Sequence, residues 1–334
     1  MKKFLALIVL FNLSFGIVFA LDIYHSEQFY TVKIENTCDI SGAGCFNLLD
    51  RLVKDGVMAF CVKDAHNGVH RAQIMAGMYD TVTGAKDAAT DISAAYGVKC
   101  AVGETYDLAT TSYKNRFSVI NTPGGIWLCE NGKFSRIFDY GKGLSGITES
   151  ADNPVDISPS GNEIVFYFKG EIYKINLETC RNTILVNSAI NGAALARSSP
   201  KWSYDGKHIA FLDKPSCTSG TCLKVINSDG SDIKFIHDNR GKKETVLSFK
   251  WDPEKDVVYF VDLSVERRVP VGGKLLLAGL DGKEKTVIEA EKGSDVDRHF
   301  RIEDNKLIFS RNEYSPFDYG TYTSKEQTLV LNRL

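Results

Sequence analysis

The sequence predicts an all-β fold made of repeated four-stranded units. The first observation is the stretch SSPKWSYDGKHIAF, residues 198–211, in which Asp205-Gly206 is followed by alternating apolar and polar residues. An Asp-Gly pair closes tight hairpins, so a strand is expected on each side of it. The second observation is a repeat of such hairpins, with turns at residues 115, 161, 206, 255 and 305, which are 46, 45, 49 and 50 residues apart. Strands at a fixed period of this length are typical of the blades of a β-propeller.

A second hairpin follows the first in each repeat, and it supplies the third and fourth strands of a blade. Its turns are Asn131-Gly132, Glu178-Thr179, Asp229-Gly230 and Asp281-Gly282. Most of these residues are types that tight turns prefer. A single blade cannot bury both faces, so neighbouring blades are expected to stack. The recurring aromatic residues are predicted to be the core that this stacking creates: Phe166, Phe211, Phe260 and Phe309, with Trp202 and Trp251 between blades.

The best-formed repeat runs from Pro200 through Trp202, Ser203, Asp205 and Gly206 to Phe211. It resembles the repeats of TolB-like β-propellers, the periplasmic component of a cell-envelope system. The resemblance extends over residues 150–310 and implies a six-bladed β-propeller of four-stranded blades over 21–334. Five blades can be counted from residue 108 onward, so the sixth is expected from the N-terminal part.

Two arrangements of residues 21–107 are open. DGVMAFCV, residues 55–62, mimics the turn and strand of the repeat and favours a first blade with an insertion at 84–107. In that arrangement QFYTVKIE, residues 28–35, would pair with the last blade, whose tail lacks a fourth strand, and would remove the open edges. The alternative is a small separate N-terminal domain over 21–107, because CFNLLDRLVKD, residues 45–55, has apolar residues at helical spacing.

Residues 1–20 have the pattern of a secretory signal peptide. Lys2 and Lys3 precede an apolar run that ends in Val18-Phe19-Ala20, which predicts cleavage after Ala20. No later segment is apolar for long enough to span a bilayer. The mature chain is therefore expected to be periplasmic or secreted, without a membrane span, and monomeric.

The eight cysteines all follow the signal peptide, which agrees with an oxidising compartment and predicts disulfides. Cys217 and Cys222 flank the turn TSGT and are the best candidate pair. Nearest-neighbour pairing would add Cys38 with Cys45, Cys61 with Cys100, and Cys129 with Cys180, although eight cysteines allow 105 connectivities.

No metal site or cofactor is predicted. The cysteines lack the spacing of zinc ligands. His66 and His70 in HNGVH would need a helix to share a metal ion, and Asn67-Gly68 between them reads as a turn. No nucleophile elbow and no phosphate-binding loop is present, so no catalytic residue is assigned.

The candidate binding residues lie in segments that enter the inner strands and would line one mouth of the central channel. Loop residues on a rigid scaffold are where binding concentrates. These positions are Asp152, Asn153, Arg197, Asp295, Asp297, Arg298 and His299.

Charge excludes one class of partner. Without the signal peptide the chain has 38 basic and 42 acidic residues, a net charge of about −4, and nucleic-acid binding requires a basic surface. The sequence therefore favours a non-enzymatic exported scaffold that binds an envelope protein or peptide. The alternative is a propeller enzyme that acts on carbohydrate with acidic residues at the channel mouth, which would need convergent carboxylates about 5–9 Å apart.

Overall fold

The computed structural model describes most of the chain after the predicted signal peptide. The described residues are 25–35, 38–39, 43–66, 69–79, 81–103, 106–113, 117–122, 124–130, 133–141, 155–187, 200–213, 220–242, 244–266, 269–290, 294–296, 299–314 and 322–331. The predicted cleavage after Ala20 lies outside them. No helix in this part of the chain is both long enough and apolar enough to cross a membrane.

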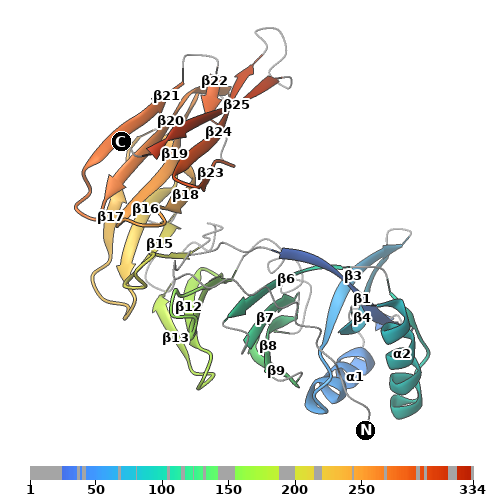
Figure 1. The fold of residues 1–334 in the computed structure, drawn as a ribbon. Helices are drawn as coiled ribbons and strands as arrows, with labels where there is room; N and C mark the ends of the chain where they lie inside the picture. Colours follow the sequence, from blue (N-terminus) through green and yellow to red (C-terminus); the bar gives the residue numbers. More distant parts are fainter. Residues whose placement is uncertain are drawn as a thin grey trace. The chain divides into compact units, whose positions relative to one another are not determined.

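The chain is mostly β and forms two compact units (Figure 1). The first comprises Met1–Pro154 with Leu177–Cys180, and the second comprises Val155–Asn176 with Arg181–Leu334. Antiparallel sheets dominate both units, which confirms the predicted β class.

The sheet of the first unit is organised around β1 (His25–Ile34). On one side β1 pairs with β6 (Tyr106–Tyr113) and β5 (Cys100–Val102), and on the other with β4 (Val69–Tyr79). The expected pairing of QFYTVKIE with the last blade is therefore wrong, because this segment lies in β1 and is paired here. The other strands of this sheet are β2 (Cys38–Asp39), β3 (Ala59–His66), β7 (Phe117–Thr122), β8 (Gly125–Glu130) and β9 (Lys133–Asp139).

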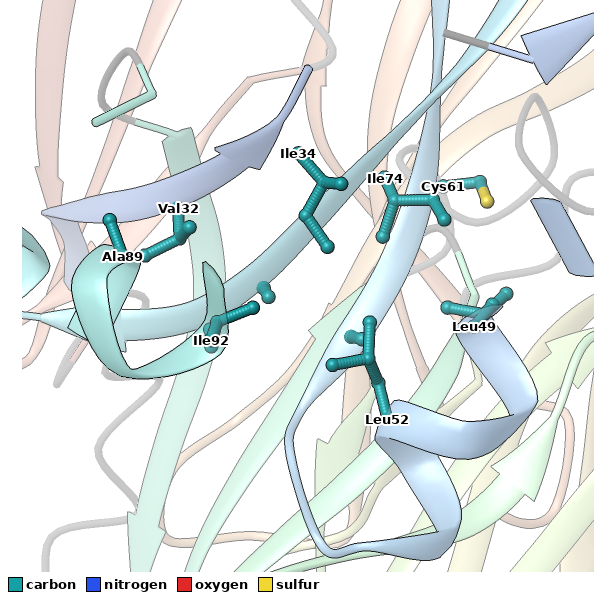
Figure 2. Close-up of a cluster of buried hydrophobic side chains, with 10 residues drawn as sticks. Val32, Ile34, Leu49, Leu52, Cys61, Ile74, Ala89 and Ile92 are labelled. Carbon is teal, nitrogen blue, oxygen red and sulfur yellow. The ribbon is translucent and has the colours of Figure 1, made fainter. Parts of the chain in front are cut away.

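Two helices belong to the first unit. The helical spacing of residues 45–55 is realised as α1 (Ala43–Lys54), and α2 (Val82–Tyr96) overlaps the segment predicted as an insertion. Thr81 caps the N-terminus of α2, and Gly97 ends it in the left-handed conformation. Both helices contribute to one apolar cluster with β1, β3 and β4 (Figure 2). Its labelled members are Val32, Ile34, Leu49, Leu52, Cys61, Ile74, Ala89 and Ile92.

The second unit repeats a four-stranded antiparallel sheet three times, which confirms the predicted repeat. The first sheet is β10 (Asp156–Ile157), β11 (Glu163–Phe168), β12 (Glu171–Asn176) and β13 (Asn182–Val186). The second is β14 (Lys201–Trp202), β15 (His208–Asp213), β16 (Cys222–Asn227) and β17 (Lys234–His237). The third is β18 (Glu244–Trp251), β19 (Val257–Glu266), β20 (Val269–Gly279) and β21 (Glu284–Glu289).

The last sheet is narrower than the others. The strands β22 (Ser294–Val296) and β23 (Arg301–Glu303) follow one another along one edge of β24 (Lys306–Tyr314), and β25 (Tyr322–Val330) pairs with the other edge. Asp304 and Asn305 form the predicted turn with φ of 47° and 61°, as a tight hairpin requires. No sheet of the described strands closes on itself, and the count of six blades stays a prediction.

The predicted aromatic core is confirmed. Phe166, Phe211, Phe260 and Phe309 are 0%, 2%, 0% and 5% exposed. Trp202 is buried in the cluster that joins the sheets of β10–β13 and β14–β17. Trp251 is partly buried, and its indole Nε1 donates to the Lys201 carbonyl at 2.9 Å. The two tryptophans thus lie at the contacts between neighbouring sheets.

Candidate functional site

A group of polar side chains with a buried centre lies between the sheets of β14–β17 and β18–β21 in the described part of the second unit. We call it the His237 cluster and define it as His237, Asn239, Glu244, Asp262 and Glu284. His237 ends β17, Asp262 lies inside β19, and Glu284 begins β21. His237, Asn239 and Asp262 are 4%, 0% and 6% exposed. Burial of so many polar groups is costly unless they are paired or bind a ligand.

A β-bulge places His237 in this cluster. Leu223 pairs with His237 while Lys224 pairs with Phe235, so Ile236 is an extra residue on β17. The bulge breaks the two-residue alternation, and the adjacent Ile236 and His237 are both buried. The ring of Phe260 packs against the imidazole with centroids 4.9 Å apart.

His237 lies between two carboxylates. Its Nδ1 is 2.7 Å from Glu284 Oε1, and its Nε2 is 3.4 Å from Asp262 Oδ2. Asn239 holds the carboxylate of Asp262 in place, because its Nδ2 donates to Asp262 Oδ1 at 3.0 Å. The same Nδ2 also donates to the Thr221 carbonyl at 3.3 Å. The imidazole is thus fixed from both sides.

The electrostatics of this site favour positive charge on the ring. Burial by itself would lower the pKa of His237, but the close contacts and negative charges of Asp262 and Glu284 outweigh it and raise the pKa above its ordinary value. The cluster therefore attracts a proton or another cation between its carboxylates.

A second group with a similar composition, Asp205, His208 and Asp256, has donor atoms within 4.8 Å of one another. Here Asp205 is committed to its own turn, because Oδ1 accepts from the Ser203 hydroxyl at 2.8 Å and from the Lys207 backbone at 3.0 Å. Its Oδ2 lies 2.9 Å from Lys207 Nζ. Burial opposes ionisation, yet these hydrogen bonds lower the pKa of Asp205 to about 2. The turn therefore accounts for Asp205, whereas His208 Nδ1 and Asp256 Oδ1 are buried without a hydrogen-bond partner.

The predicted channel-mouth residues are described only in part. Asp152, Asn153, Arg197, Asp297 and Arg298 lie outside the described residues. Asp295 is buried on β22 opposite Asn312, and His299 is exposed in the turn that precedes β23. A side chain on Gly273 would meet the Asp295 side chain and the Val296 backbone at 3.4 and 3.3 Å, so this glycine allows β22 to approach β20 closely.

Two of the predicted disulfides are wrong. Cys61 and Cys100 are free thiols, and β4 and β1 lie between their strands. At about 4.8 Å per strand these residues are about 14 Å apart, beyond the Cα separation of about 4–7 Å that a disulfide spans. Cys180 is also a free thiol, so the pair with Cys129 is not formed. Cys217, like the side chains of Cys38 and Cys45, lies outside the described part, and the pairing of Cys217 with Cys222 stays a prediction.

His66 and His70 lie on a hairpin and not on a helix. His66 ends β3, and His70 follows the first residue of β4. The strands are in register there, with His70 opposite Ala65, and the turn expected at Asn67-Gly68 lies outside the described residues.

The His237 cluster is not among the predicted site residues. One available signal was Asp262, a carboxylate inside the otherwise apolar run from Val257 to Leu263. A charged residue in a buried strand needs a partner or a ligand. The bulge that directs His237 toward Asp262 could not be predicted from the sequence in the same way.

Comparison with known proteins places the chain near solved β-propellers only at low similarity. No family model and no curated protein sequence matches it. It is similar to TolB from Acinetobacter baumannii, at 13% identity over 83% of this chain and 64% of that chain, with a TM-score of 0.37. It is similar to the β-propeller domain of the Trilobed protease from Pyrococcus furiosus, at 13% identity over 67% and 63% of the two chains, with a TM-score of 0.38. A prolyl endopeptidase structure aligns at 11% identity over 87% of this chain and 44% of that chain, with a TM-score of 0.49. These values do not establish a shared function.

Proposed function

We propose that the protein is an exported binding scaffold that captures an extended segment of a protein or peptide in the cell envelope along the outer edge of β25. The observation that carries the proposal is the width of the last sheet. Each of the three preceding sheets has a fourth strand, whereas none of the described strands pairs with the outer edge of β25.

The strand β25 is well formed. All nine of its residues pair with β24 in unbroken register, from Tyr314 opposite Tyr322 to Lys306 opposite Val330. Such an edge presents a row of backbone donors and acceptors to another strand. An extended peptide that adds to a sheet edge forms main-chain hydrogen bonds, which give affinity. Every second side chain of the peptide contacts the same face of the sheet, and these contacts give specificity.

The exposed side chains of β25 suit a partner strand that binds and dissociates. Residues 323–326 are exposed, and Val330 is 46% exposed at the end of the strand. Lys325 and Glu326 are charged, which opposes the pairing of two copies of this chain through the same edge. A partner strand with complementary charges and an apolar residue opposite Val330 fits this surface.

The predicted mouth residues extend the proposal. Asp295 lies on β22 and His299 in the turn before β23, on the edge of β24 opposite to β25, with Asp297 and Arg298 between them in the sequence. We propose that these residues, with Asp152, Asn153 and Arg197, contribute side-chain contacts to the partner. Export follows from the predicted signal peptide and places the partner in the envelope.

Two adjacent proline variants test the strand addition. Consecutive backbone N–H groups of a strand point to opposite edges, so one of Gln327→Pro and Thr328→Pro removes a bond to β24 and the other removes only an outward donor. The variant that loses the bond to β24 is identified by its lower urea midpoint. Each tagged protein is then used to capture partners from the crosslinked envelope of the native host, with quantitative mass spectrometry.

The outward-facing proline should keep the wild-type urea midpoint and lose the stoichiometric partner. Capture of the same partner at the wild-type level by that variant would overturn the proposal for β25. Loss of the partner in an Asp297→Ala, His299→Ala variant, with both proline variants still capturing the partner at the wild-type level, would instead place the contact at the channel mouth.

A further inference from the structure

We propose that His237, Asp262 and Glu244 bind a divalent transition-metal ion of the Zn²⁺ class. This site does not involve β25 and does not depend on the proposed partner binding. A ring nitrogen of His237 and one carboxylate oxygen each of Glu244 and Asp262 lie within 4.8 Å of one another.

The spacing of the two buried donors fits a tetrahedral ion. Zinc lies about 2.0–2.2 Å from nitrogen and oxygen ligands, so two ligands at the tetrahedral angle are about 3.3–3.6 Å apart. His237 Nε2 and Asp262 Oδ2 are 3.4 Å apart. Nε2 is shielded from solvent and makes no hydrogen bond, although the pair is close. A shared metal ion explains both the separation and the missing hydrogen bond.

The ligands are supported by a second layer of contacts of the kind that metal sites use. Metal-binding histidines commonly donate their other ring nitrogen to a carboxylate, which fixes the ring and its tautomer. Glu284 Oε1 is 2.7 Å from His237 Nδ1 and can accept that hydrogen bond. Asn239 Nδ2 donates to Asp262 Oδ1 at 3.0 Å, so the oxygen that does not face His237 is also held.

The donor set selects the class of ion. One imidazole nitrogen and two carboxylate oxygens suit zinc and its neighbours, whereas Ca²⁺ and Mg²⁺ prefer oxygen alone and more ligands. Three protein ligands leave a fourth tetrahedral position open for water or a ligand. Glu244 has a side chain 33% exposed and lies 3.9 Å from Lys242 Nζ, so it is a more accessible ligand than the buried His237 and Asp262.

The chain offers a matched control in Asp205, His208 and Asp256. This group has the same donor types within the same 4.8 Å. It differs at one ligand, because both oxygens of Asp205 are engaged by Ser203 and Lys207, and the ammonium of Lys207 already supplies a cation 2.9 Å from Oδ2. A cation attracted merely to clustered carboxylates and a histidine would respond to changes in either group.

The test is a titration of the metal-stripped mature protein with Co²⁺, followed by competition with Zn²⁺. All variants carry Cys180→Ser, because the exposed thiol of Cys180 could bind either ion. We expect one Co²⁺ per chain with the intense visible absorption of tetrahedral cobalt, and its displacement by one Zn²⁺. Glu244→Gln and Asp262→Asn should weaken binding at least 10-fold, and Glu284→Gln by about 10–100-fold.

The control variant Asp256→Asn should bind Co²⁺ as the parent protein does. The proposal is overturned if no stoichiometric cobalt site exists, if Glu244→Gln and Glu284→Gln both leave the affinity unchanged, or if Asp256→Asn weakens binding instead. Urea midpoints of the metal-free variants establish folding. Should Asp262→Asn not fold, the half-buried Glu244 and Glu284 decide the outcome.

Discussion

The substitution Asn239→Ala tests how far the His237 cluster depends on the residue that organises it. Asn239 is fully buried, and its amide donates to Asp262 Oδ1 and to the Thr221 carbonyl. The variant loses one hydrogen bond to a charged group, worth about 1.5–3 kcal/mol, and one neutral bond, worth about 1 kcal/mol. We therefore expect the free energy of unfolding to fall by about 2.5–4 kcal/mol, because both acceptors lose their donor.

The measurement is urea unfolding of the metal-stripped chain followed by tryptophan fluorescence. Trp202 and Trp251 report on the second unit, and a Trp127→Phe background removes the signal of the first. For a unit of this size the expected loss corresponds to a decrease in Tm of about 5–16 °C. Asn227→Ala is the control, because Asn227 donates to Ser231 in an exposed turn of the same sheet, and it should cost about 0.5 kcal/mol or less. Equal midpoints for the two variants would refute the reasoning.

Three further predictions concern single groups. Hydrogen bonds outweigh burial and lower the pKa of Asp205 to about 2 in the folded state. Its contribution to stability is therefore present above about pH 4 and lost as the pH falls toward 2, and the difference in urea midpoint between wild type and Asp205→Asn should shrink over that interval. Burial raises the pKa of the Cys61 thiol to about 11, so iodoacetamide at pH 7.5 should modify Cys180 in the native protein and Cys61 only after unfolding, as peptide mass spectrometry will show. Gly125 has φ of 151°, and a Cβ there would lie 2.1 Å from the Phe138 carbonyl oxygen. Gly125→Ala should therefore lower the thermal midpoint of the first unit, and a midpoint within about 1 °C of wild type would contradict the strain.

The repeated sheets could be predicted because each carries its own local signals. A turn such as Asp205-Gly206 fixes the hairpin, and the alternation after it directs Ile209 and Phe211 to the buried side. These signals act within about fifteen residues and recur in each repeat, so the third and fourth strands were also located. The same reasoning identified Phe260 and Phe309 as core before any packing was known.

The His237 cluster could not be predicted because it depends on contacts between sheets. His237 and Glu284 are separated by 47 residues, and Asp262 lies on a third strand between them in the chain. The bulge at Ile236 reverses the direction that simple alternation would give to His237. Disulfide pairing failed for a related reason, since nearest neighbours in sequence, Cys61 and Cys100, are separated by two strands of the sheet.

The strand expected to complete the last sheet is already used elsewhere. Within β1, Val32 and Lys33 pair with β4 on one side and with β5 on the other. Alternation in QFYTVKIE specified a strand but not its partner, because register and partner are set by tertiary context. Any strand on the outer edge of β25 must then come from another molecule or from a different segment of this chain. The two proline variants distinguish a strand supplied by another molecule from a strand supplied by this chain. A strand from the same chain contributes to folding, so loss of the outward donor would lower the urea midpoint of the isolated protein. A partner strand contributes only when it is bound, so the midpoint would change only in the presence of the captured partner.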